Sequence, residues 1–162
     1  MTLTDLAVKE TKSFLANNPD ASAEEIAELV VNQQMASALK SYDKVHIFIR
    51  AAITENFFKG KEIEKYSPVV SVITNSNPIM ERHLIAAVEA LCVEKPKTFP
   101  VIIKQFFDED ALEEDVILEW ASEGRSEYTL DSLDEESRAT LRSEMEPVLV
   151  WLQEDDSDSD EE

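Results

Sequence analysis

Helical spacing of apolar residues runs through almost the whole chain, and only two glycines, Gly60 and Gly124, interrupt it. Tight β-hairpin turns need backbone conformations that glycine adopts most easily, so this chain offers few places for them. The six prolines fall mostly where helices would begin or end. The sequence therefore predicts an all-α fold, and 162 residues suit a single domain.

Cap and breaker residues divide the pattern into about eight helices with short links. Ser22 begins a capping box, Pro68 is expected to bend or break the fourth helix, and Asn77 with Pro78 starts the fifth. The helices are expected at 3–16, 22–39, 44–58, 61–74, 78–92, 98–107, 112–122 and 134–153. Helical hairpins of this kind stack as a solenoid or close as a bundle, and we favour the solenoid.

The acidic residues are concentrated in the last third of the chain. Residues 108–162 contain 22 acids and 3 bases, whereas residues 1–107 contain 13 acids and 12 bases. Such a surface repels nucleic acid phosphates and anionic membranes and attracts basic proteins. The final segment, EDDSDSDEE at 154–162, has the composition of a disordered tail that follows a helical domain at 1–153.

No motif in the sequence points to catalysis, a metal or a cofactor. His46 and His83 lie in separate predicted helices without clustered ligands, and helical spacing places Cys92 in the core. There is no glycine-rich phosphate loop, no membrane-spanning apolar stretch and no export signal. We therefore expect a soluble, monomeric, cytoplasmic binding protein rather than an enzyme.

Two segments join an apolar helical face containing one tryptophan to a cluster of carboxylates. They are FFDEDALEEDVILEWASE at 106–123 and VLVWLQEDDSDSDEE at 148–162. In the first, Asp115, Glu119 and Glu123 form a row of like charges, which costs an isolated helix about 0.2–0.5 kcal/mol per pair. Helix stability does not explain this row, whereas a basic ligand would.

In the second segment the acids Glu154, Asp155 and Asp156 follow a helix, where the helix dipole is already negative. A basic ligand is the simplest explanation for them, and the alternative is a tail that serves solubility. Trp120 and Trp151 are expected in the core, with their helices presenting the acids around them.

These two segments resemble the aromatic-acidic boxes of the C-terminal domain of eukaryotic translation initiation factor five. The resemblance covers essentially the whole chain and implies a HEAT-like stack of helical hairpins. It also implies that lysine-rich segments in the N-terminal tail of the beta subunit of initiation factor two bind at the two boxes. The residues concerned would be Asp108, Glu109, Asp110, Glu113, Glu114, Asp115, Glu119 and Trp120 in the first, and Trp151, Glu154, Asp155, Asp156, Asp158 and Asp160 in the second.

The same resemblance implies contacts with initiation factor one and a subunit of factor three. A basic group, Lys59, Lys61 and Lys65, with Lys95, Lys97 and Lys104 further along the chain, is a candidate second surface for such partners, or simply a set of solvated lysines. Ser157 and Ser159 each precede an acid by three residues, as acidophilic kinases prefer, so phosphorylation there would add negative charge.

Three alternatives remain open at this point. The epsilon subunit of the factor-two nucleotide exchange factor and the factor-five mimic proteins end in the same type of domain, although the long Ser-Asp-Glu ending favours factor five. A generic acidic chaperone for basic proteins such as histones is the alternative of another class. The GTPase-activating domain and zinc ribbon of factor five have no counterpart in these 162 residues, so activation chemistry is not expected of this chain.

Overall fold

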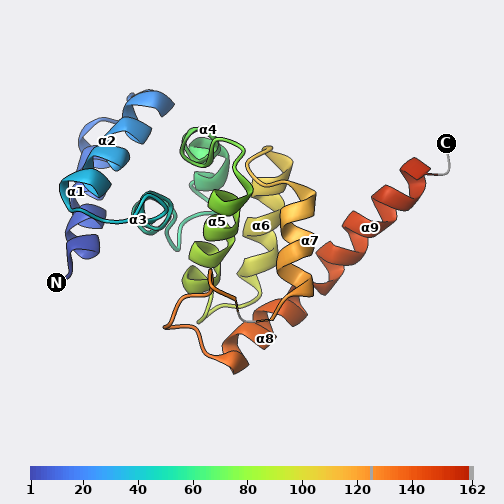
Figure 1. Cartoon of the computed structure of the whole chain (residues 1–162). Helices are drawn as coiled ribbons and strands as arrows, with labels where there is room; N and C mark the ends of the chain where they lie inside the picture. Colours follow the sequence, from blue (N-terminus) through green and yellow to red (C-terminus); the bar gives the residue numbers. More distant parts are fainter. Residues whose placement is uncertain (125, 161–162) are drawn as a thin grey trace.

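The computed structural model describes residues 1–124 and 126–160, with side chains in the last helix described as far as 154. Within these residues the chain forms nine helices and no strands (Figure 1). Their bounds are α1 (Leu3–Asn17), α2 (Ala23–Ala36), α3 (Asp43–Ala52), α4 (Glu62–Thr74), α5 (Pro78–Leu91), α6 (Thr98–Asp108), α7 (Glu114–Ser122), α8 (Glu135–Glu144) and α9 (Glu146–Asp160).

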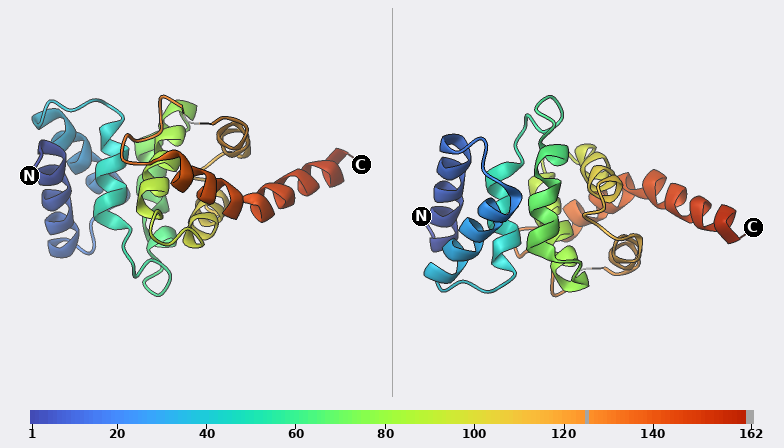
Figure 2. Two further views of the ribbon diagram at one scale, coloured as in Figure 1. Left: turned by 90° about the horizontal axis from the view of Figure 1, so that it is seen from below. Right: turned by 90° about the horizontal axis from the view of Figure 1, so that it is seen from above.

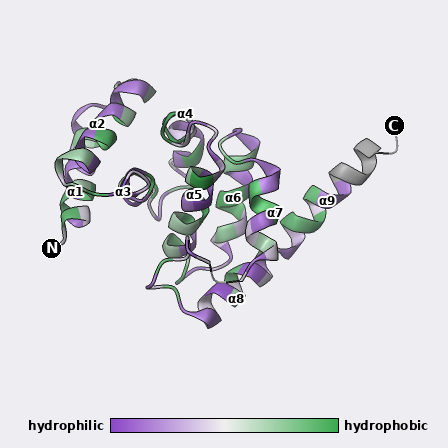
Figure 3. Cartoon of the chain, viewed as in Figure 1, coloured by the Kyte–Doolittle hydropathy of each residue, from purple (hydrophilic) through white to green (hydrophobic). Residues whose placement is uncertain are grey.

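The helices pack as a two-layer stack of antiparallel hairpins. In one layer α1 contacts α3, α3 contacts α5, and α5 contacts α7. In the other layer α2 contacts α4, α4 contacts α6, and α6 contacts α8. Most helices bury one face, and Figure 3 shows hydrophobic and hydrophilic stretches alternating along the helices. This arrangement is the predicted HEAT-like stack rather than a closed bundle.

Several predicted helix ends differ from the structure. α3 stops at Ala52, not residue 58, because the Glu62 carboxylate accepts hydrogen bonds from the Thr54 amide at 2.8 Å and hydroxyl at 2.9 Å. α4 continues through Pro68, and the Ser67 hydroxyl donates to the Ile63 carbonyl at 2.6 Å beside it. These bonds are formed by side chains, so spacing of apolar residues did not reveal them.

The helix predicted at 134–153 is two helices. α8 ends at Glu144 and α9 begins at Glu146, next to Pro147, which has no amide hydrogen to continue the ladder. The backbone of α9 runs to Asp160, and residues 161–162 lie outside the described part. The division into a helical domain at 1–153 and a disordered tail at 154–162 stays a prediction. All views show α9 extending beyond the stack (Figure 2).

α5 lies at the centre of the stack and is enclosed by α3, α4, α6 and α7. Every residue from 81 to 89 is buried, including three charged ones, Glu81, Arg82 and Glu89. Buried charges require partners, so the charged side chains of α5 hold the neighbouring helices in position. In the described part of the chain, no helix is long and apolar enough to cross a membrane.

The two histidines meet in the core, although they lie in separate helices as predicted. His46 Nε2 on α3 is 3.3 Å from His83 Nδ1 on α5, and the ring of Tyr42 stacks on His83 with centroids 4.0 Å apart. Burial lowers the pKa of His46, and burial together with the nearby His46 lowers the pKa of His83 from 6.5 to about 4. Asp43 and Arg50 act on this pair in opposite directions, Asp43 raising and Arg50 lowering the pKa of His46.

Stability is therefore expected to fall as the pH falls below the ordinary histidine pKa. The folded protein binds these protons less readily than the unfolded chain does, so the stabilisation is complete above pH 6.5 and is lost as the pH falls towards 4. We expect a loss of about 2 kcal/mol between pH 7 and pH 5, measured by urea unfolding. The variant His83→Phe should show a flatter pH dependence, and an unchanged slope would contradict this assignment.

Candidate protein-binding surface

The first acidic cluster lies at the turn between α6 and α7. Asp110 adopts a left-handed conformation with φ of 62°, while the Asp110 and Ala111 amides donate to the Phe107 and Phe106 carbonyls at 3.0 and 2.8 Å. This is a Schellman ending, and it buries Ala111 against Phe106. The carboxylates of Asp108, Glu109 and Asp110 are consequently exposed.

The start of α7 adds three more acids to this cluster. Glu113 and Asp115 are exposed and Glu114 is half-buried. The backbone amide of Glu113 donates to the buried Glu81 carboxylate of α5 at 2.7 Å, and burial raises the pKa of Glu81. α5 thus fixes the start of α7, and the acids of the first turn complement the helix dipole.

The row of like charges on α7 has a structural partner that the sequence analysis missed. Arg82, only 3% exposed on α5, donates to Glu119 at 3.0 Å and to Glu123 at 2.8 Å. Its guanidinium also lies 4.7 Å from the ring centroid of Tyr128, and its side-chain bonds lower the pKa of Glu123. The row therefore has a structural explanation besides a basic ligand, and Glu119 is partly committed to the fold.

Two arginines of α8 hold the other end of α7. Arg138 donates to the Trp120 carbonyl at 3.2 Å and lies 3.8 Å from the buried Glu89 carboxylate. Arg142 donates to the Ala121 carbonyl at 2.9 Å. These bonds satisfy carbonyls that a helix end leaves without amide partners. Sequence reasoning missed both residues. The available signal was Glu89, a charged residue within the apolar pattern of α5, because such a residue needs a partner when it is buried.

The two tryptophans occupy different environments. Trp120 is 3% exposed and packs against Phe99 and the guanidinium of Arg138. Trp151 is half-buried on α9, where Phe107 meets its ring nearly at a right angle with centroids 5.8 Å apart. Trp120 is a core residue as expected, whereas Trp151 keeps part of its ring at the surface.

The aromatic contact of Trp151 connects the two acidic segments. Phe107 belongs to α6, directly before the first acidic cluster, and α9 also packs on α7. Glu154 of the second cluster is exposed. Asp155, Asp156, Asp158, Asp160, Ser157 and Ser159 belong to α9 by backbone, but their side chains lie outside the described residues. The structure therefore brings together the parts of α6, α7 and α9 that lie next to the two clusters.

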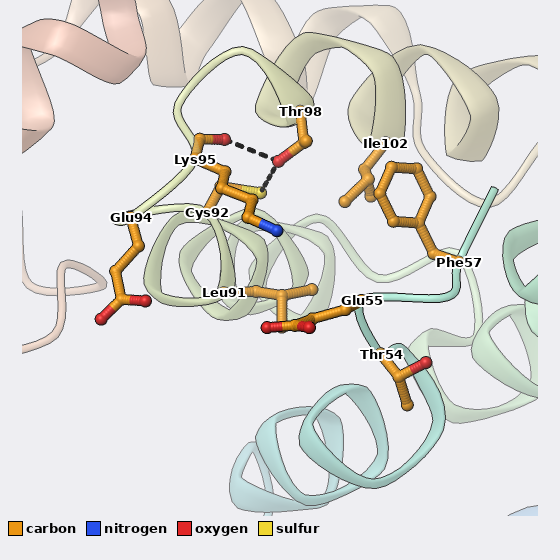
Figure 4. Close-up of a pocket in the computed structure, with 9 residues that line it drawn as sticks. All are labelled: Thr54, Glu55, Phe57, Leu91, Cys92, Glu94, Lys95, Thr98 and Ile102. Atoms are coloured by element: carbon orange, nitrogen blue, oxygen red, sulfur yellow. Dashed lines mark hydrogen bonds between the residues drawn. The ribbon is translucent and has the colours of Figure 1, made fainter.

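The first three lysines of the basic group lie elsewhere, whereas Lys104 pairs with Asp108 of the acidic cluster. Lys59, Lys61 and Lys65 are exposed at the loop before α4 and in its first turns, and Lys65 lies over the ring of Tyr66 at 5.2 Å. The loop before α4 meets the loop after α5 at a cavity of about 130 Å³ that Phe57, Leu91 and Lys95 help to line (Figure 4). Thr98 donates there to the Lys95 carbonyl at 2.7 Å and to Cys92 Sγ at 3.3 Å.

The chemistry of this cavity is inert. Cys92 is 1% exposed, and burial raises the pKa of its thiol to about 11, so the nucleophilic thiolate is disfavoured. Among the residues whose side chains are described, no group of three or more His, Cys, Asp and Glu could hold a metal ion. The candidate binding surface is thus the set of exposed carboxylates at the end of α6 and the start of α7, beside the contact between Phe107 and Trp151.

Comparisons with known proteins agree with this geometry. The family model described as W2: eIF4-gamma/eIF5/eIF2-epsilon matches residues 80–162. Eukaryotic translation initiation factor 5 of Drosophila melanogaster is 33% identical over 104 residues, which are 61% of this chain and 21% of that protein. The factor of Pongo abelii is 28% identical over 109 residues, 63% of this chain and 24% of that protein.

A plant relative and a solved structure extend the comparison. Probable eukaryotic translation initiation factor 5-1 of Arabidopsis thaliana is 34% identical over 83 residues, 49% of this chain and 16% of that protein. The structure of the C-terminal domain of translation initiation factor 5 at low pH has a TM-score of 0.70 and 20% identity, and the match covers 96% of this chain and 95% of that one. This likeness shows a shared fold.

The matched part of this chain spans about a quarter or less of the length of these curated relatives. The family match covers 83 of the 162 residues, including all of α6, α7 and α9, on which the acidic surface is built. The resemblance inferred from the aromatic-acidic segments is thereby confirmed. The chain belongs to the W2 family of eIF4-gamma, eIF5 and eIF2-epsilon.

Proposed function

We propose that this chain is an adaptor domain of translation initiation that binds lysine-rich segments of the beta subunit of initiation factor two. The observation that supports this proposal most strongly is the joining of the two acidic segments by Phe107 and Trp151. The exposed acids Asp108, Glu109 and Asp110 lie next to this contact, at the end of α6. In this role the chain acts by binding, in the cytoplasm, and not by catalysis.

The physics of the surface suits a disordered basic ligand. Exposed carboxylates form individually weak contacts of about 0.2–1 kcal/mol, and salt screens them beyond a Debye length of roughly 8 Å. Many such contacts produce fast, salt-sensitive association. The buried arginines Arg82 and Arg138 hold α7 in place, so the acids are presented on a fixed helix.

Other partners fit the second surface. Lys59, Lys61 and Lys65 are exposed and belong to the side of the stack formed by the loop before α4. We propose that acidic segments of other initiation factors, such as factors one and three, bind there. The exchange-factor epsilon subunit or a factor-five mimic would use the acidic surface in the same way, and the relatives named above favour factor five.

A calorimetric titration tests the proposal. The chain is titrated with a lysine-rich peptide from the beta subunit and with a scrambled peptide of equal charge, at about 50 and 300 mM salt. We expect the native peptide to bind more tightly than the scramble, with affinity falling about tenfold or more at the higher salt. Equal binding of both peptides would support a generic acidic chaperone, and no binding would contradict the proposed function.

A further inference from the structure

A lysine of this chain already lies on the aromatic-acidic surface. Lys104 Nζ on α6 is 3.0 Å from Asp108 Oδ2 and 4.7 Å from the ring centroid of Trp151 on α9. The edge-to-face contact between Phe107 and Trp151, with an interplanar angle of 88°, supports the ring from another side. The side chains of Lys104 and Asp108 are 43% and 48% exposed, so a ligand can reach this ammonium.

Helix stability does not account for this contact. In an i,i+4 pair the favourable order places the acid first, whereas here Lys104 precedes Asp108. Asp108 is also the last residue of α6, where a negative charge is unfavourable to the helix dipole. Lys104 is moreover the last lysine in the sequence, and 22 of the 35 acids follow it. The contacts that Lys104 makes with α9, through the Trp151 ring, explain the pair better than the stability of α6 does.

The Trp151 ring and the Asp108 carboxylate are the kinds of group that bind an ammonium ion. An indole face attracts a lysine ammonium by about 0.5–1 kcal/mol at an exposed position, and a carboxylate adds a charge-assisted hydrogen bond. The ring and the carboxylate come from different helices, so the site exists only where α9 packs beside α6. A lysine from another protein would find the same two groups, provided that Lys104 left them.

We propose that Trp151 and Asp108 form a lysine-binding site that Lys104 occupies in the free protein, and that a lysine of the basic partner displaces it. The inference rests on the proposed function, since it concerns the same acidic surface. Self-occupation lowers the affinity for any lysine-rich segment and favours ligands that place several lysines at once, because a single lysine only exchanges one contact for an equal one.

The test compares two variants with the same loss of charge. Lys104→Gln empties the site, and Lys97→Gln removes a charge from an exposed lysine seven residues earlier. We expect Lys104→Gln to bind the lysine-rich peptide about threefold more tightly than Lys97→Gln does, corresponding to one exposed cation–π contact. In a Trp151→Leu background this difference should disappear, and circular dichroism confirms that each variant is folded.

A second readout follows the ammonium itself. In the unmodified chain, saturating peptide should increase the rate at which Lys104 is reductively methylated, with Lys97 as the internal reference. Equal affinities of the two glutamine variants, or an unchanged methylation rate at Lys104 while the peptide binds, would overturn the inference and leave the proposed function intact. Failure of the unmodified chain to bind any lysine-rich peptide would instead overturn both.

Discussion

Arg138→Met is expected to lower the free energy of unfolding by about 3–5 kcal/mol. The substitution keeps most of the side-chain volume but removes the guanidinium from the Glu89 carboxylate, whose side chain is 2% exposed. It also removes the donor to the Trp120 carbonyl and the cation that lies 5.1 Å from the Trp120 ring. A buried carboxylate is costly to desolvate and depends on nearby positive charge, which is why the expected effect is large. Urea unfolding followed by circular dichroism measures it.

A neighbouring arginine provides the matched control for this prediction. Arg142 lies one turn later on α8, is 35% exposed and pairs with an exposed Glu146 at 2.8 Å. Arg142→Met should cost only about 1 kcal/mol, because solvent replaces most of what is lost. The double variant Arg138→Met with Glu89→Gln should recover much of the stability, since neither member of this pair then carries a charge. Equal costs for Arg138→Met and Arg142→Met would contradict the buried network described above.

Neutralising the first turn of α7 is expected to produce the largest loss of binding. The triple variant Glu113→Gln, Glu114→Gln and Asp115→Asn should bind the lysine-rich peptide about tenfold more weakly at physiological salt. This estimate takes about 0.5 kcal/mol for each lost charge pair. The salt dependence of the remaining binding should also be shallower, because fewer charges take part. Calorimetry at two salt concentrations measures both quantities.

Three exposed acids of α2 allow a control of equal net charge. The variant Glu24→Gln, Glu25→Gln and Glu28→Gln removes the same three charges from a helix at the far end of the stack (Figure 1). It should leave affinity within about twofold of the unmodified chain, because it lies well beyond a Debye length from α7. Equal weakening by both triple variants would show that only total charge matters and would support the generic chaperone.

The fold was largely predictable because its signals are local. Apolar spacing located all the helical segments, although it merged α8 and α9 into one, and the side chains of Ser22 and Asn77 accept the expected amide bonds. The end of α2 was predicted three residues too late, and this helix closes without glycine. Ala38 and Asp110 take left-handed conformations after α2 and α6, a role that sequence reasoning assigns to glycine. The break between α8 and α9 was missed because Pro147 lies within a strong apolar pattern, which favoured one continuous helix over the break that a proline often causes.

The sequence predicts which segments carry the acids, but it does not predict which of these acids pair with a basic residue of the fold. Charge counts and the two tryptophans identified the segments, since these features are read directly from the sequence. Arg82 lies 37 residues before Glu119, and only the stacking of α5 on α7 brings the two together. The lesson is that a row of like charges on a helix can have its counter-ion in the core, so Glu119 is less available to a ligand than the acids of the preceding turn.

The most direct test of the central claim is a nuclear magnetic resonance titration of the isotope-labelled chain with the lysine-rich peptide of the beta subunit. We predict that amide shifts concentrate at residues 104–119 and at the first turns of α9, and that the Trp151 indole signal moves while signals of α1 and α2 stay unchanged. Shifts concentrated on α1 to α4, or no shifts at saturating peptide, would contradict the claim that the joined acidic surface is the binding site.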